Sequence, residues 1–123
     1  MGVSAPSIQA FGLRASIFEA EELAAEDWRV IEVHPEVSFC AMAGRPPTHS
    51  KKSWNGVMER IRLLAAAGCG IQSHIGAAGV AGVDDVLDAC AAAWSAERYR
   101  TGEAISLPAP PEQIGARSVA IWY

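Results

Sequence analysis

Only two segments of the chain have the pattern of a β-strand, and they lie far apart. Residues 29–34 alternate around Ile31 and Val33, and residues 117–123 end in the apolar triplet Ile-Trp-Tyr. The residues between them have the pattern of helix or loop, so the two strands are expected to run parallel, in an α/β arrangement with both faces covered. Because two strands rarely form a stable sheet alone, strand 29–34 is expected to border a partner subunit or a further N-terminal segment.

Four stretches have helical periodicity together with residues typical of helix ends. The predicted helices are residues 7–25, 36–43, 53–67 and 84–101. Pro35 fits the first turn of the second helix, and Gly44 is expected to end it. Ser53 can cap the third helix, and Gly102 is expected to stop the fourth.

The connections between these elements differ in character. Residues 45–52 form a polar loop, which is expected to be the most mobile part of the chain. Residues 69–82 are rich in glycine and alanine and allow no firm prediction, and residues 107–111 are expected to be an extended connection interrupted by proline. With no internal repeat and no convincing internal boundary, residues 1–123 are interpreted as a single domain.

Composition limits the classes of function. Half of the chain is hydrophobic, which indicates a globular protein, and the formal net charge of −4 gives no general attraction for nucleic acid. A polyanion would therefore need a local basic patch. The three cysteines are odd in number and widely spaced, so a reducing, cytoplasmic setting is expected rather than a disulfide framework. No apolar run reaches membrane-spanning length, and no membrane association is expected.

The acidic residues Asp84, Asp85 and Asp88 begin the last predicted helix. Asp85 and Asp88 are three residues apart, so both are expected to project from one helix face at the edge of an apolar seam. Repulsion and desolvation destabilise such a pair unless a cation meets it, and a divalent metal ion is the most economical candidate. Capping of the helix N-terminus is an equally good interpretation of Asp84 and Asp85, and Glu32 can be an exposed residue of a half-solvated strand.

Other polar residues allow similar alternatives. His34, His49 and His74 have no common ligand spacing, which argues against a zinc site. Lys51 and Lys52 can be a solvated loop or a contact to phosphate. Tryptophan rings can stack with nucleic-acid bases, but three tryptophans of this chain are expected to be core or interface residues instead. These are Trp28, Trp94 and Trp122.

Four blocks of the sequence, in order, resemble an uncharacterised family of predicted ribonuclease-H-like nucleases. The blocks are Ile31–Phe39, Ser50–Ser53 with Gly56 and Arg60, Asp84–Ala89, and Ile121–Tyr123. The resemblance covers nearly the whole chain. It implies a mixed sheet with helices on both sides, and hydrolysis of phosphodiesters by two divalent metal ions, Mg²⁺ or Mn²⁺, held by carboxylates.

The resemblance also implies roles for individual residues. Glu32, Asp85 and Asp88 would be the catalytic metal ligands. Auxiliary roles fall to Glu36, Asp84 and His34, and Lys51 and Lys52 would contact phosphate.

The chain departs from the family at its start. Family members begin with a strand that carries a first catalytic Asp, whereas the residues before Glu32 have the pattern of a helix. The chain is therefore expected to correspond to the C-terminal half of such a domain. Two hypotheses follow: a metal-dependent nuclease or a remnant of one, and a non-catalytic assembly module that forms a dimer, or binds a strand-supplying partner, through an open sheet edge.

Overall fold

The computed structural model describes residues 8–123, and its contacts divide the chain into a unit that ends at Ile31 and a unit formed by Glu32–Tyr123. The first unit contains helices α1 (Ile8–Gly12) and α2 (Arg14–Glu26). The predicted helix over residues 7–25 is therefore broken at Leu13, and its first residue, Ser7, lies outside the described residues.

The expected apolar face of this first helical segment is not buried. Phe11 is 65% exposed and Phe18 is 49% exposed, and α2 contains no buried residue. The Arg14 guanidinium lies over the Phe18 ring, 5.3 Å from its centroid. Helical spacing predicted the helix correctly, because backbone conformation depends on local pattern, but it does not say what covers the apolar face.

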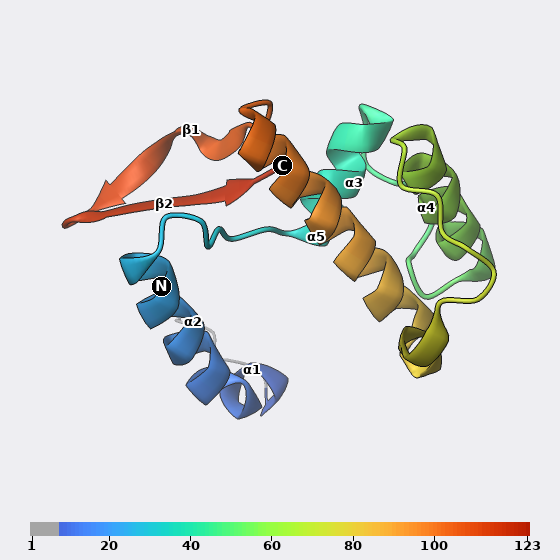
Figure 1. Cartoon of the computed structure of the whole chain (residues 1–123), viewed down its shortest axis with the longest axis horizontal. Coiled ribbons are helices and arrows are strands. Elements are labelled where there is room, and N and C mark those ends of the chain that lie inside the picture. Colours follow the sequence, from blue (N-terminus) through green and yellow to red (C-terminus); the bar gives the residue numbers. More distant parts are fainter. Residues whose placement is uncertain (1–7) are drawn as a thin grey trace, which may run out of the picture. The chain divides into compact units, whose positions relative to one another are not determined.

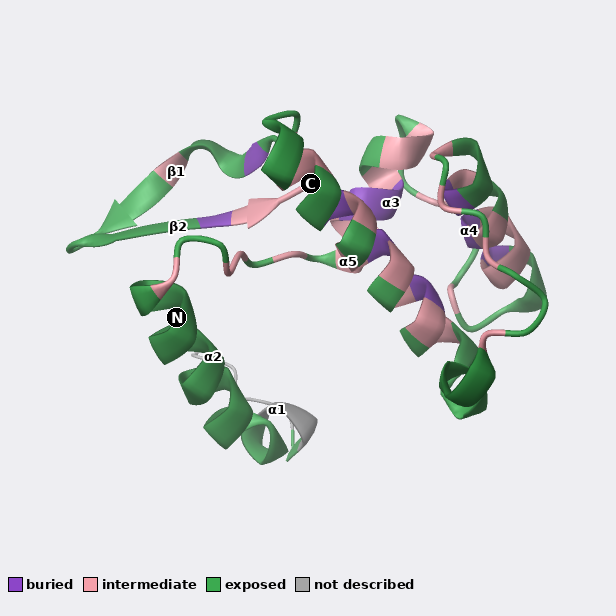
Figure 2. Cartoon of the chain, viewed as in Figure 1, coloured by how far each residue is buried: buried purple, intermediate pink, exposed green. Residues whose placement is uncertain are grey.

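The second unit is built on three helices, α3 (Pro35–Ala43), α4 (Trp54–Ala66) and α5 (Val83–Thr101), with a short 3₁₀ helix η1 (Gly76–Val80) before α5 (Figure 1). Its core lies where the three helices meet and consists of Phe39, Leu64, Leu87 and Ala91 (Figure 2). None of the helices described between residues 8 and 123 is long and apolar enough to cross a membrane.

The predicted ends of these helices are confirmed. Gly44 and Gly102 follow α3 and α5 in the left-handed conformation, with φ of 66° and 78°, which costs a residue without Cβ little. Ser53 caps α4, since its Oγ accepts the N–H of Gly56 at 3.0 Å.

One polar pair is buried inside the helical core. The hydroxyls of Ser38 and Ser95 are 2.8 Å apart, and both residues are fully buried. The hydrogen bond joins α3 to α5 and gives the buried Ser95 hydroxyl its partner, while the Ser38 hydroxyl also has the His34 carbonyl at 3.5 Å.

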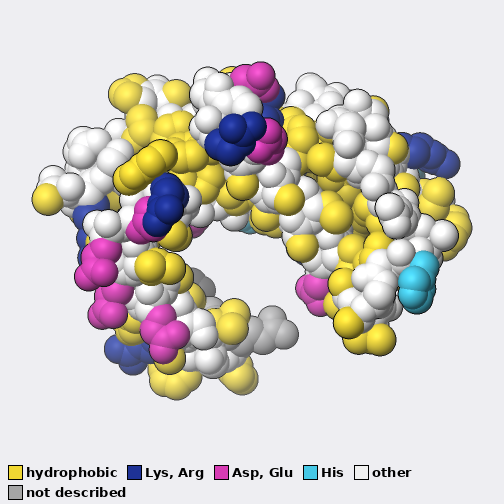
Figure 3. Space-filling view, viewed as in Figure 1, with side chains coloured by type: hydrophobic (Ala, Val, Ile, Leu, Met, Phe, Trp, Pro, Cys, Tyr) yellow, Lys and Arg dark blue, Asp and Glu magenta, His cyan; other side chains and the backbone are white. Residues whose placement is uncertain are grey.

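The C-terminal hairpin pairs β1 (Ser106–Ile114) with β2 (Arg117–Trp122) in antiparallel register. The expected connection over residues 107–111 is therefore part of a strand, although the register shifts between Leu107 and Glu112. The three prolines of this stretch donate no ladder hydrogen bond, which accounts for the irregularity. Figure 3 shows hydrophobic side chains exposed over the hairpin, and Leu107 and Ile114 are 50% and 57% exposed.

The predicted strand over residues 29–34 is wrong for the described chain. Glu32 alone forms a bridge, parallel to Ile121, and its carbonyl accepts the N–H of Trp122 at 2.9 Å. The direction agrees with the predicted parallel arrangement, but this segment meets β2 only at the end of that strand. The fold is therefore mixed α/β and rich in helix, with a two-stranded antiparallel sheet among the described residues.

Candidate functional site

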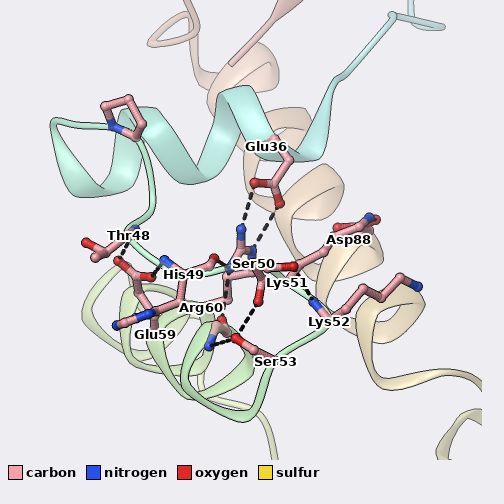
Figure 4. A network of polar contacts seen from close by, with 12 residues as sticks. Glu36, Thr48, His49, Ser50, Lys51, Lys52, Ser53, Glu59, Arg60 and Asp88 are labelled. Carbon is pink, nitrogen blue, oxygen red and sulfur yellow. Dashed lines mark hydrogen bonds and ion pairs between the residues drawn. The ribbon is translucent and has the colours of Figure 1, made fainter.

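The loop between α3 and α4 is held by a carboxylate of α4. Glu59 accepts the backbone N–H groups of Thr48 at 2.9 Å and His49 at 3.0 Å (Figure 4). These two hydrogen bonds lower the pKa of Glu59 below its ordinary value. Arg45 adds hydrogen bonds to Pro46 O at 3.0 Å and Thr48 Oγ1 at 2.5 Å. The loop thus has a defined shape although no regular element contains it.

Arg60 joins the same loop to α3. Its guanidinium donates to both carboxylate oxygens of Glu36, at 3.0 and 2.7 Å, and to the carbonyl of His49 at 3.1 Å. The residue is 2% exposed and lies over the Phe39 ring at 5.4 Å. A charge buried this far needs a paired, bidentate partner, so Glu36 serves to neutralise Arg60.

Gly56 allows the loop to lie directly on α4. A Cβ at this position would stand 1.8 Å from the carbonyl oxygen of Ser50. No larger side chain fits without moving backbone, so this glycine sets the distance between the loop and the helix.

The end of this loop places two ammonium groups against α5. Lys51 Nζ lies 2.6 Å from Asp88 Oδ2, and Lys52 forms an ion pair with Asp84. The bond to Asp88 raises the pKa of Lys51, and the bond to Lys52 lowers the pKa of Asp84. The second oxygen of Asp88, Oδ1, is buried and has no hydrogen-bond partner among the described residues.

Asp85 forms no ion pair with either lysine among the described residues. It lines an apolar hollow together with Ile71, Ala89 and Cys90, and its carboxylate lies beside Gly82, as does that of Asp84. Around the axis of a helix, side chains four residues apart, such as Asp84 and Asp88, point in directions that differ by about 40°. Side chains three residues apart, such as Asp85 and Asp88, differ by about 60° in the opposite sense. The lysines approach on the side of α5 that Asp84 and Asp88 share.

The remaining predicted site residues lie apart from this pair. Glu32 is exposed, and its hydrogen bond to Trp122 is made by its backbone carbonyl. His34 caps α3 through its carbonyl, which accepts the N–H of Val37 at 2.9 Å, and its imidazole makes no capping bond.

Residues 8–123, as the structure describes them, do not form a complete two-metal centre. In the part of the chain that the structure describes, no group of three or more His, Cys, Asp or Glu side chains is close enough to hold a metal ion. Asp84 and Asp88 are the two carboxylates that lie one turn apart on a single surface, and each is bound by a lysine. A carboxylate-held pair of metals needs more oxygen ligands than these two residues provide.

A second hollow lies on the outer face of α4. It is about 290 Å³ in volume, and its lining includes Trp54, Met58 and Arg62, which follow one another at four-residue intervals. Arg45 and His49 of the loop contribute to the same wall. This site was not predicted from the sequence, although the i, i+4, i+8 spacing of these three residues indicates that they lie on one face of a helix.

The chain belongs to the family described as "Protein of unknown function (DUF429)", which matches residues 3–113. No curated protein and no solved structure matches the chain.

Proposed function

From the resemblance of four sequence blocks to predicted ribonuclease-H-like nucleases, and from the contact of two α5 carboxylates with two lysines, we propose that this chain is part of a ribonuclease-H-like, divalent-metal-dependent nuclease. In this proposal Asp88 and Asp84 contribute to a site for Mg²⁺ or Mn²⁺. Further carboxylates, which a second metal ion requires, come from groups outside the described residues, on a longer polypeptide or on a second chain, so the chain by itself is expected to hold one ion. Glu32 and Asp85 stay predicted ligands, and either would have to turn toward Asp88 to join it.

The observation that carries the proposal is the surface formed by Lys51, Lys52, Asp84 and Asp88. Carboxylate oxygens are the ligands that Mg²⁺ and Mn²⁺ prefer, and ammonium groups suit phosphate. The raised pKa of Lys51 keeps its charge at neutral pH, and the unpartnered Oδ1 of Asp88 has free acceptor capacity. A chain of net charge −4 needs such a local cationic group to meet a polyanion.

Calorimetric titration of the purified chain with Mg²⁺ and with Mn²⁺ tests the proposal. Saturable binding is expected, and Asp88→Asn should abolish it while leaving the circular dichroism spectrum unchanged. Glu97→Gln is the matched control, because Glu97 lies on the same helix and its charge is taken up by Arg100. An unchanged metal affinity in Asp88→Asn, or no saturable binding in the parent chain, contradicts the proposal.

The hairpin favours a second candidate, a non-catalytic assembly module. Glu32 bridges β2 at one position only, and hydrophobic side chains of the hairpin are exposed, including Leu107 and Ile114. An open strand edge with apolar residues can pair with another chain. This candidate predicts a dimer in sedimentation velocity experiments, and a single monomeric species at micromolar concentration refutes it.

A further inference from the structure

The hollow on the outer face of α4 combines an exposed aromatic ring with cationic groups. Trp54, the first residue of α4, is 76% exposed and makes no ring contact within residues 8–123. Arg62 is exposed two turns later on the same wall and has no ion pair among the described residues. A single exposed tryptophan is ordinary, but one that shares a cavity with arginines suggests a ligand that is both aromatic and anionic.

The charges of this hollow favour an anion. Arg45 and Arg62 are both cations, and Glu59 is the acid that lines the same wall. The carboxylate of Glu59 is already engaged, because it accepts two backbone N–H groups and lies 3.5 Å from the Arg45 guanidinium. Arg62 therefore keeps its charge available to a ligand. With Arg45 paired to Glu59, the hollow carries one net positive charge, that of Arg62, on a chain whose net charge is −4.

We propose that this hollow binds single-stranded nucleic acid, with one base stacked on Trp54 and a neighbouring phosphate at Arg62. Stacking on an aromatic ring together with arginine contacts to the backbone is the usual way in which proteins hold single strands. The volume of about 290 Å³ suits one nucleotide, and duplex bases are already stacked on each other and not free to enter. The amide of Asn55 and the imidazole of His49 offer hydrogen bonds to a base edge.

This assignment deepens the proposed function and rests on it only for the identity of the substrate. His49 of the hollow is two residues from Lys51, a chain distance of at most about 7 Å. A strand held on Trp54 would therefore continue past the lysines that contact Asp84 and Asp88. The hollow would position the single strand, and the carboxylate surface would meet its backbone.

Fluorescence anisotropy of labelled twelve-nucleotide oligo-dT and oligo-U tests the assignment, measured in EDTA so that no metal takes part. Trp54→Ala should weaken binding about 10-fold or more, the loss of one stacked base, and Trp54→Phe should restore most of it. Arg62→Gln should weaken binding and reduce the slope of log K against log salt by about 0.7. A blunt duplex should bind more weakly than either single strand.

Two matched controls should bind like the parent chain. Trp28→Ala removes a tryptophan that is equally exposed, at 77%, and Arg100→Gln removes an exposed arginine that is paired with Glu97. The strand titration is made in EDTA and the metal titration without nucleic acid, so a failed metal titration and a failed strand titration are separate results. Equal affinity in Trp54→Ala, a preference for duplex, or full competition by polyglutamate overturns the assignment, and the last outcome would indicate an acidic protein partner.

Discussion

Gly56→Ala is expected to destabilise the second unit, although alanine is the better helix former. In an unconstrained helix interior the replacement stabilises by about 1 kcal/mol. At this position the new Cβ would lie 1.8 Å from the carbonyl oxygen of Ser50, so that oxygen must retreat by at least about 1.2 Å to reach the 3.0 Å minimum of real contacts. The displaced atom belongs to backbone and cannot rotate away as a side chain would.

The displacement breaks hydrogen bonds that the structure identifies. The Ser50 carbonyl accepts the N–H of Ser53 at 2.9 Å and its hydroxyl at 2.8 Å, and the neighbouring His49 carbonyl accepts from Arg60 at 3.1 Å. Each of these three hydrogen bonds contributes about 1 kcal/mol, so their loss costs about 3 kcal/mol. This cost exceeds the gain of about 1 kcal/mol in helix propensity by about 2 kcal/mol. Arg60 is 2% exposed, so an unpaired donor there raises the cost to about 4 kcal/mol.

Thermal unfolding followed by circular dichroism measures this change. A loss of 2–4 kcal/mol corresponds to a fall in Tm of about 10–25 °C for a unit of this size. Gly70→Ala is the control, since no atom lies within 4 Å of the place that its Cβ would occupy, and it should stay within about 1 kcal/mol of the parent. Faster hydrogen exchange at the Ser53 amide should accompany the fall. A raised Tm, as helix propensity alone predicts, would refute the reasoning.

Three further predictions concern the core and the loop. Ser38→Ala removes the hydroxyl that pairs with the buried Ser95, so urea unfolding should show a loss of about 1–3 kcal/mol. Ser95→Ala should cost less, because the Ser38 hydroxyl still has the His34 carbonyl at 3.5 Å, and strict additivity in the double variant would contradict a direct bond. Leu64→Ala removes a fully buried side chain and should cost about 2–5 kcal/mol by the same assay. The pKa of Glu59 is lower in the folded chain than its ordinary 4.5, so its stabilising effect is present above that pH and is lost as the pH falls through the folded value. The difference in Tm between the parent and Glu59→Gln should accordingly shrink below pH 4.5, and a difference that grows on acidification would disprove the role.

The helices of the second unit could be predicted from the sequence because their signals are local. Ser53 caps α4 through a bond to an N–H three residues away, and Gly44 and Gly102 end their helices through their own backbone conformation. Such features depend on a few neighbouring residues, and they appear in any tertiary context that tolerates the helix. The predicted strand over residues 29–34 failed because a strand is defined by its ladder of partners, and the described chain offers it one bridge.

The candidate sites needed the tertiary structure. The amino-acid sequence by itself determined that acids begin α5 and that two lysines precede α4, but not which carboxylates the lysines would meet. That choice is made by the Lys51–Asp88 contact, across 37 residues, and the Glu36–Arg60 contact spans 24. Helical spacing limits the direction in which each side chain leaves its helix. The tertiary packing of the loop on α4 at Gly56 then decides which carboxylates the lysines meet, and these are Asp84 and Asp88.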